Sequence, residues 1–134
     1  MDITHLTDHI DNSIKEAVSK TAFYFESELS RVFQTEGRSL DINWADYKNP
    51  DYFQEKVSKG FSEKKLHKTT SLAQSFSHTL DGYKAQIGTP VKYAQFHEFG
   101  TSKFVSRPFF KPVLDHVINE NIFSRFLKEA LENG

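Results

Sequence analysis

The sequence predicts an α+β fold, with two long amphipathic helices packed on a small antiparallel sheet built around a β-hairpin. Two segments with helical spacing of apolar residues, one near each end of the chain, predict the helices. Between them, two short alternating runs meet at an Asp-Gly pair, which predicts the hairpin. The length of 134 residues is usual for one domain, so we expect a single domain over residues 1–134.

The first helix is expected to begin near Thr7, whose hydroxyl can cap the first turn. Its end is expected at Gly37, because glycine tolerates the left-handed conformation that closes many helices. Steps of three and four residues place one face of the helix at Ile10, Ile14, Ala17 or Val18, Thr21 or Ala22, Phe25, Leu29, and Val32 or Phe33.

The middle of the chain has no clean period between residues 38 and 68, which is typical of a loop. A short helix is expected near residues 71–74. The strands follow over residues 76–80 and 83–87, joined by a two-residue turn at Asp81-Gly82 with positive φ at both positions. A hairpin alone is marginally stable, so we expect a third strand near residues 103–109 or 40–44.

The last third of the chain is expected to hold a helical turn and a long helix. Tyr93, Phe96 and Phe99 have helical spacing, and Gly100 is expected to end that turn. An extended loop then leads to a second long helix over residues 113–132, with Pro112 near its start.

Composition argues against several classes of function. The net charge is -1. Electrostatic binding to nucleic acid or to an anionic membrane is therefore not expected, because it needs an excess of Lys and Arg. The chain has no cysteine, which removes thiol catalysis and zinc–thiolate sites. His5 and His9 have the i,i+4 spacing of metal ligands, but no third ligand is evident. We therefore expect no enzyme activity, cofactor, metal or membrane partner.

Residues 93–112 are the part of the chain richest in aromatic residues, with five of its 13 phenylalanines. One interpretation is a hydrophobic plug, in which Tyr93, Phe96 and Phe109 fill the core while Arg107 hydrogen-bonds a carbonyl or Glu98. The other is a rigid loop that presents aromatic residues and arginine, the residue types enriched at interface hot spots.

This stretch resembles a signature of tail-completion and neck proteins of tailed phages. The string GTPVKYAQFHEFGT, residues 88–101, precedes an Arg-Pro-Phe-Phe block at residues 107–110 and a C-terminal helix. Four preceding features are similar to the Mu-type virion morphogenesis family, namely Thr35-Glu36-Gly37, Trp44, the pattern LHKTTSLAQS at residues 66–75 and the Asp81-Gly82 hairpin. The resemblance covers roughly residues 33–114.

The resemblance implies a structural protein of a phage, prophage or phage-tail-like particle. Such a protein would complete the tail or join it to the head connector, with no catalysis and no cofactor. It would be assembled in the bacterial cytoplasm and reside in the virion. Its partners would be other virion proteins, namely the tail tube or terminator and the head connector. We expect a homo-oligomer, for which a hexameric ring is one form. The expected interface residues are Tyr93, Phe96, Glu98, Phe99, Gly100, Phe104, Arg107, Pro108, Phe109 and Phe110.

Two other functions are compatible with the sequence. Residues 56–68 carry five Lys against one Glu, which would suit a small regulatory protein that binds nucleic acid. Only Phe61 interleaves these charges, whereas stacking of bases needs an aromatic platform. A small hydrolase would need a polar pocket around His97 and Glu98.

Overall fold

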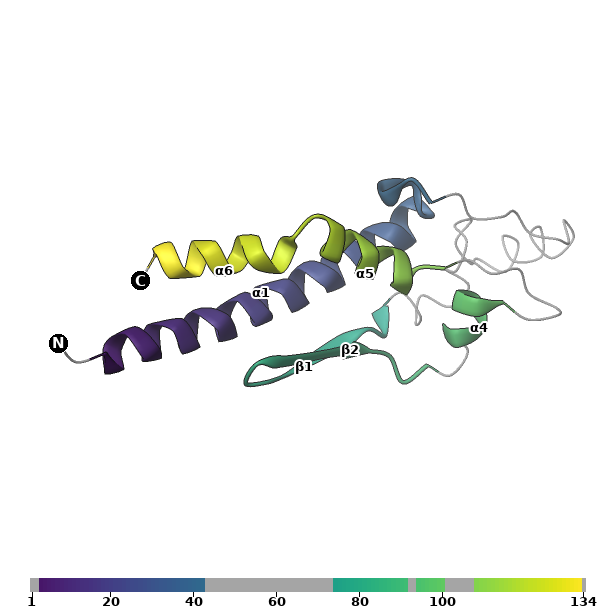
Figure 1. Ribbon diagram of the computed structural model, residues 1–134. Coiled ribbons are helices and arrows are strands. Elements are labelled where there is room, and N and C mark those ends of the chain that lie inside the picture. Colours follow the sequence, from purple (N-terminus) through teal and green to yellow (C-terminus); the bar gives the residue numbers. More distant parts are fainter. Residues whose placement is uncertain (1–2, 43–73, 92–93, 101–107, 134) are drawn as a thin grey trace, which may run out of the picture.

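The computed structural model describes residues 3–42, 74–91, 94–100 and 108–133, except for the side chains of Phe96 and His97. In chain order the described elements are α1 (Thr4–Thr35), a 3-10 turn η1 (Arg38–Leu40), β1 (Ser77–Asp81), β2 (Lys84–Gly88), α4 (Ala94–Phe99), α5 (Phe110–Asn119) and α6 (Ile122–Glu132). The long helix α1 has α5 and α6 along one side and the hairpin along the other (Figure 1). The predicted α+β fold with a β-hairpin is confirmed.

Helix α1 begins earlier than its sequence predicts. The first helical residue is Thr4, and the expected cap at Thr7 is wrong. The Thr7 hydroxyl instead donates to the carbonyl of Ile3, 3.1 Å away, one turn back inside the helix. A threonine side chain that bonds back in this way leaves the helix free to extend toward the N-terminus.

The predicted end of α1 at Gly37 is confirmed. Glu36 and Gly37 both adopt the left-handed conformation, with φ of 54° and 88°. The N–H of Gly37 donates to the carbonyl of Val32 at 2.8 Å, which is the closing bond of a Schellman-type cap. The chain then folds back so closely that a Cβ on residue 37 would lie 2.8 Å from the carbonyl oxygen of Ile42.

Replacing Gly37 with alanine is expected to lower the free energy of unfolding by about 2 kcal/mol. Alanine is strained at the positive φ of this position, and its Cβ would also clash with the backbone of Ile42. Gly88→Ala is the matched control, since a Cβ there meets nothing within 4 Å. Its effect should stay within about 0.5 kcal/mol. Urea unfolding of both variants measures the difference, and equal midpoints would contradict the tight turn.

The hairpin has the predicted faces but a different turn. Asp81 pairs with Lys84, so the two-residue loop is Gly82-Tyr83 and the predicted turn at Asp81-Gly82 is wrong by one residue. Positive φ occurs at Gly82, 58°, and not at Tyr83, as in a type II′ turn. Such a turn needs glycine at its first position only, so Asp81 stays in the strand.

The predicted third strand is not found in the described residues, where the sheet contains β1 and β2 alone. Leu40 belongs to the 3-10 turn that follows α1, and Phe109 leads directly into α5. Of the two candidate segments, residues 43–44 and 103–107 lie outside the described residues. The same is true of residues 71–73 of the short helix expected near residues 71–74, and of the basic segment 56–68.

The C-terminal helix is interrupted, which corrects the prediction of one helix over residues 113–132. It starts at Phe110 and breaks at Asn121, whose φ of 54° is left-handed. Val117 and Ile122 are successive buried residues of this segment, and they are five positions apart. In a continuous helix, successive residues on one face are three or four positions apart. The break restores the phase of the helix, so both α5 and α6 turn an apolar face toward α1.

The core lies where the second half of α1 meets α5, α4 and the base of the hairpin. Its buried members are Phe25, Leu29, Val32, Phe33, Ala94, Phe109, Val113, Val117 and Ile122. Phe33 is fully buried, with ring centroids of Phe109 and Phe76 at 5.1 and 6.1 Å. Aromatic rings from α1, from the residue before β1 and from the start of α5 therefore hold the layers together.

Candidate functional site

The two blocks of the predicted interface motif are joined by the Glu98 carboxylate. Glu98 lies near the end of α4 and reaches the first turn of α5. Its Oε1 accepts the backbone N–H groups of Phe109 and Phe110 at 3.0 and 2.8 Å, and its Oε2 accepts that of Lys111 at 3.2 Å. The next residue, Pro112, has no N–H to satisfy.

This arrangement satisfies the whole N-terminal end of α5. The first four residues of a helix have no acceptor within it, and here three are bonded to Glu98 while the fourth is proline. A carboxylate at this end also interacts favourably with the helix dipole. Glu98 therefore fixes α4 to α5, and both its oxygens accept capping hydrogen bonds.

Phe109 and Phe110, two of the expected interface residues, are part of the core or packed on it. Phe109 is 2% exposed, and its ring lies 5.6 Å from that of Phe76. The half-buried Phe110 ring lies 4.9 Å from that of Phe25 on α1. The interpretation of Phe109 as a core residue is thus confirmed, while Pro108 is half-buried beside it.

Phe99 is the expected interface residue that faces solvent. It is the last residue of α4 and is 80% exposed, more than any other large apolar residue in the described part of the chain. Gly100, with φ of 76°, ends the helix directly after it, as predicted. Tyr93, Phe104 and Arg107, together with the side chain of Phe96, lie outside the described residues.

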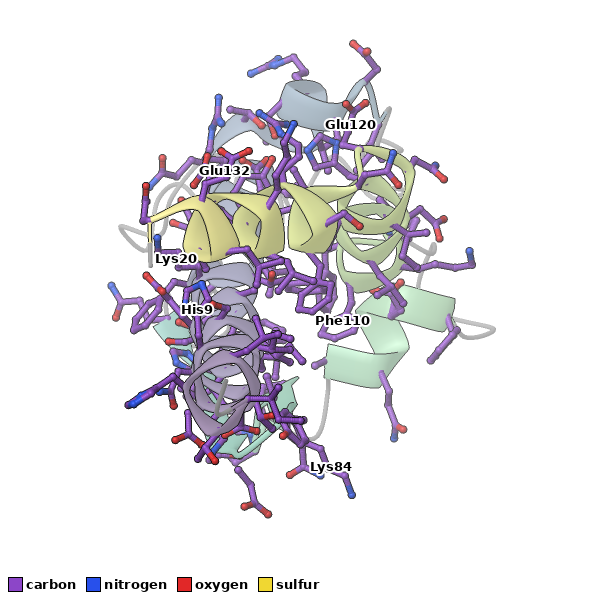
Figure 2. All side chains as sticks on the ribbon, turned by 60° about the vertical axis from the view of Figure 1, so that its left-hand side comes forward. His9, Lys20, Lys84, Phe110, Glu120 and Glu132 are labelled. Atoms are coloured by element: carbon purple, nitrogen blue, oxygen red, sulfur yellow. The ribbon has the colours of Figure 1, made fainter. Side chains whose placement is uncertain are left out.

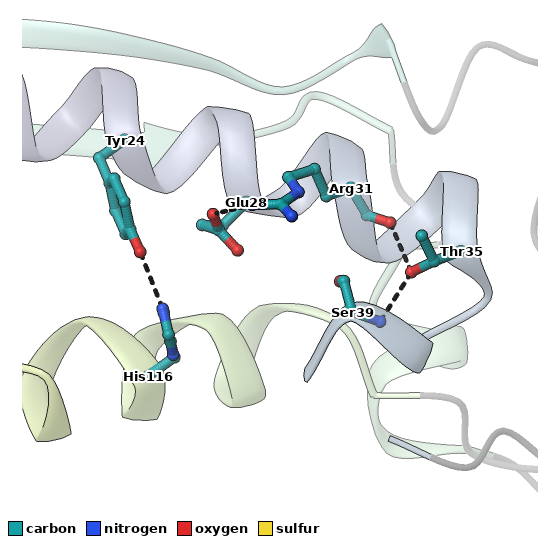
Figure 3. Close-up of polar contacts among 6 residues, drawn as sticks. All are labelled: Tyr24, Glu28, Arg31, Thr35, Ser39 and His116. Carbon is teal, nitrogen blue, oxygen red and sulfur yellow. Dashed lines mark hydrogen bonds and ion pairs between the residues drawn. The ribbon is translucent and has the colours of Figure 1, made fainter. Parts of the chain in front are cut away.

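A polar cluster between α1 and α5 was missed by sequence reasoning (Figure 3). The Tyr24 hydroxyl and His116 Nε2 are 2.8 Å apart, and the buried Glu28 accepts from Arg31 at 3.1 Å. Burial raises the pKa of the Tyr24 phenol above its usual value, and the neighbouring Glu28 adds to this. The only signal in the sequence is that Tyr24 lies off the main apolar stripe.

Two more histidines join α1 to its neighbours. His78 of β1 lies 2.7 Å from the Glu26 carboxylate, and the Phe23 ring meets its imidazole edge-on at 4.6 Å. His9 Nε2 lies 3.0 Å from the carbonyl of Leu131 on α6. Within the described ranges, three or more His, Asp or Glu side chains do not gather as metal ligands would. No described helix is long and apolar enough to cross a membrane.

Comparison with known proteins adds no relative. No family model, no curated protein and no solved structure matches this chain.

Proposed function

We propose that this chain is a structural assembly protein of a phage, prophage or phage-tail-like particle. In this role it completes the tail or joins it to the head connector through protein–protein contacts. It is assembled in the bacterial cytoplasm and stays in the virion. The motif resemblance at residues 88–110 suggests the role, and the placement of Phe99 beside the Glu98 cap is the observation that carries it.

Phe99 has the properties of an interface anchor. A phenylalanine ring that is 80% exposed gains by burial against a partner, and aromatic residues are large enough to dominate an interface. Its neighbour Glu98 is fixed by three hydrogen bonds to α5, so the backbone that presents Phe99 is already ordered. Binding through a preorganised residue loses less conformational entropy than binding through a loose one.

The experiment replaces Phe99 with serine in the phage or prophage that encodes the chain. We expect joined, tailed particles in electron micrographs to fall at least about tenfold, with the thermal midpoint of the purified variant unchanged. Phe23→Ser is the matched control, because Phe23 is 60% exposed on α1 and lies away from the motif. Normal numbers of joined particles from the Phe99→Ser variant would contradict the proposal.

A further inference from the structure

Helices α5 and α6 carry a second apolar stripe beside the one that faces α1. The inner stripe consists of Val113, Val117, Ile122, Phe126 and Ala130, all buried or half-buried. The second stripe is formed by the residue that follows each of these in the sequence, namely Leu114, Ile118, Phe123, Leu127 and Leu131. Four of these five are 37–60% exposed, so this stripe is apolar without being covered.

The first half of α1 has an open apolar stripe as well. Ile3, Leu6 and Ile10 are 67%, 59% and 42% exposed. The last of them follows His9, which contacts the backbone of Leu131 on α6. These residues lie at the end of the molecule that holds both termini, which Figure 2 brings forward with α6 above α1 and the hairpin below.

Both stripes lie on the same side of the α1–α6 pair. The two helices run antiparallel (Figure 1), and each residue step turns a right-handed helix by about 100°. On each helix, the residue that follows one in the α1–α6 contact therefore points to the same side of the helix pair. The core shows this directly, because Tyr24 contacts Phe126 while the next residue, Phe25, contacts Phe110, four residues before Leu114.

The result is a line of exposed apolar side chains that borders the core along α5 and continues over α6 and the first half of α1. We name this surface, formed by Ile3, Leu6, Ile10, Leu114, Ile118, Phe123, Leu127 and Leu131, the open face. A helix with two adjoining apolar stripes has the pattern of a bundle helix, which packs against two neighbours rather than one.

We propose that the open face binds the open face of a second copy of this chain. At about 200 Å² for a fully exposed side chain, its exposed members present about 700 Å², close to the roughly 800 Å² per partner of a stable interface. The chain's net charge of -1 opposes self-association only weakly. This contact does not depend on the virion role, because Phe99 is not part of the open face.

Packing of the exposed apolar residues sets how the two copies are oriented. A two-fold axis parallel to α1 sets α1 of one copy against α6 of the other, so that the exposed residues of each helix are covered by those of the second copy. The four helices then form a bundle in which each neighbour is antiparallel, closed by a self-complementary contact.

Sedimentation of the full chain over a wide range of concentration tests the association. We expect a monomer–dimer equilibrium whose dissociation constant rises at least about tenfold in Ile10→Glu and Phe123→Glu, because each buries an unpaired charge at the contact. Phe23→Glu is the matched control and should dimerise normally. A monomer at all concentrations, or equal weakening by Phe23→Glu, would overturn the proposal, provided circular dichroism shows each variant folded.

Disulfide cross-linking tests the orientation, since the natural chain has no cysteine. The Ile10→Cys and Leu131→Cys variants are purified separately, mixed and oxidised. Contact of α1 with the second copy's α6 predicts that the mixed product makes up clearly more than half of the cross-linked dimer, which is the share that random pairing of the two variants would give. A predominance of the Ile10→Cys homodimer, or a mixture at random proportions, would overturn the arrangement.

Discussion

Replacing Phe109 with alanine is expected to lower the free energy of unfolding by about 3–5 kcal/mol, the usual cost of removing a buried phenylalanine. Phe109 is 2% exposed and packs between Phe33 of α1 and Phe76 before the hairpin. The truncation leaves a cavity where three segments meet, and rings held by the surrounding backbone cannot collapse fully into it.

Urea unfolding of purified protein measures this loss. The matched control is Phe99→Ala, the same chemical change ten residues earlier at a side chain that is 80% exposed. Its free energy of unfolding should stay within about 0.5 kcal/mol of the natural chain. Similar losses in the two variants would show that the core does not lie where the structure places it.

Replacing Glu98 with alanine is expected to lower the free energy of unfolding by about 2–3 kcal/mol, more than a single helix cap usually contributes. The reason is that one carboxylate accepts three backbone N–H groups at the start of α5. Its removal leaves those donors without their acceptor and also removes a charge that interacts favourably with the helix dipole.

Two controls separate the cap from a general effect of lost charge. Glu98→Gln keeps one acceptor oxygen and should lose less stability than Glu98→Ala. Glu129→Ala removes an exposed carboxylate from α6 and should change the free energy of unfolding by less than about 0.5 kcal/mol. If Glu98→Ala and Glu129→Ala unfold at the same urea concentration, the cap contributes nothing.

These two results bear on how motif variants are interpreted. Loss of particle assembly in a Phe109 or Glu98 variant would report on folding, since both residues hold α5 in place. Loss of assembly in a Phe99 variant would report on contact with a partner. A scan of the motif therefore needs a stability measurement for each variant before any residue is assigned to an interface.

Local signals in the sequence predicted much of the fold. The apolar stripe of α1, its stop at Gly37, the alternating faces of the hairpin and the helical turn ended by Gly100 all depend on neighbours within a few residues. Spacing of three, four or two residues and the conformational freedom of glycine are enough to predict such features. The five phenylalanines of residues 93–112 likewise indicated either a hydrophobic plug or a loop that presents aromatic residues.

Other features depend on residues far apart in the chain. The break at Asn121 is needed because α5 and α6 must both turn an apolar face toward α1. The role of Glu98 depends on α5 beginning beside α4, because Glu98 and Phe109 are eleven positions apart in the sequence. Pairing of Tyr24 with His116 joins positions 92 residues apart, which no local pattern can indicate.

The sequence by itself determined that this is a charge-balanced, phenylalanine-rich α+β chain with one dense aromatic motif. Only the tertiary structure decided which aromatic residues are covered, placing Phe109 in the core and leaving Phe99 and the open face in solvent. The physical reason is that composition and spacing fix how apolar a segment is. Burial depends on which other segments reach it, and long-range packing alone sets that.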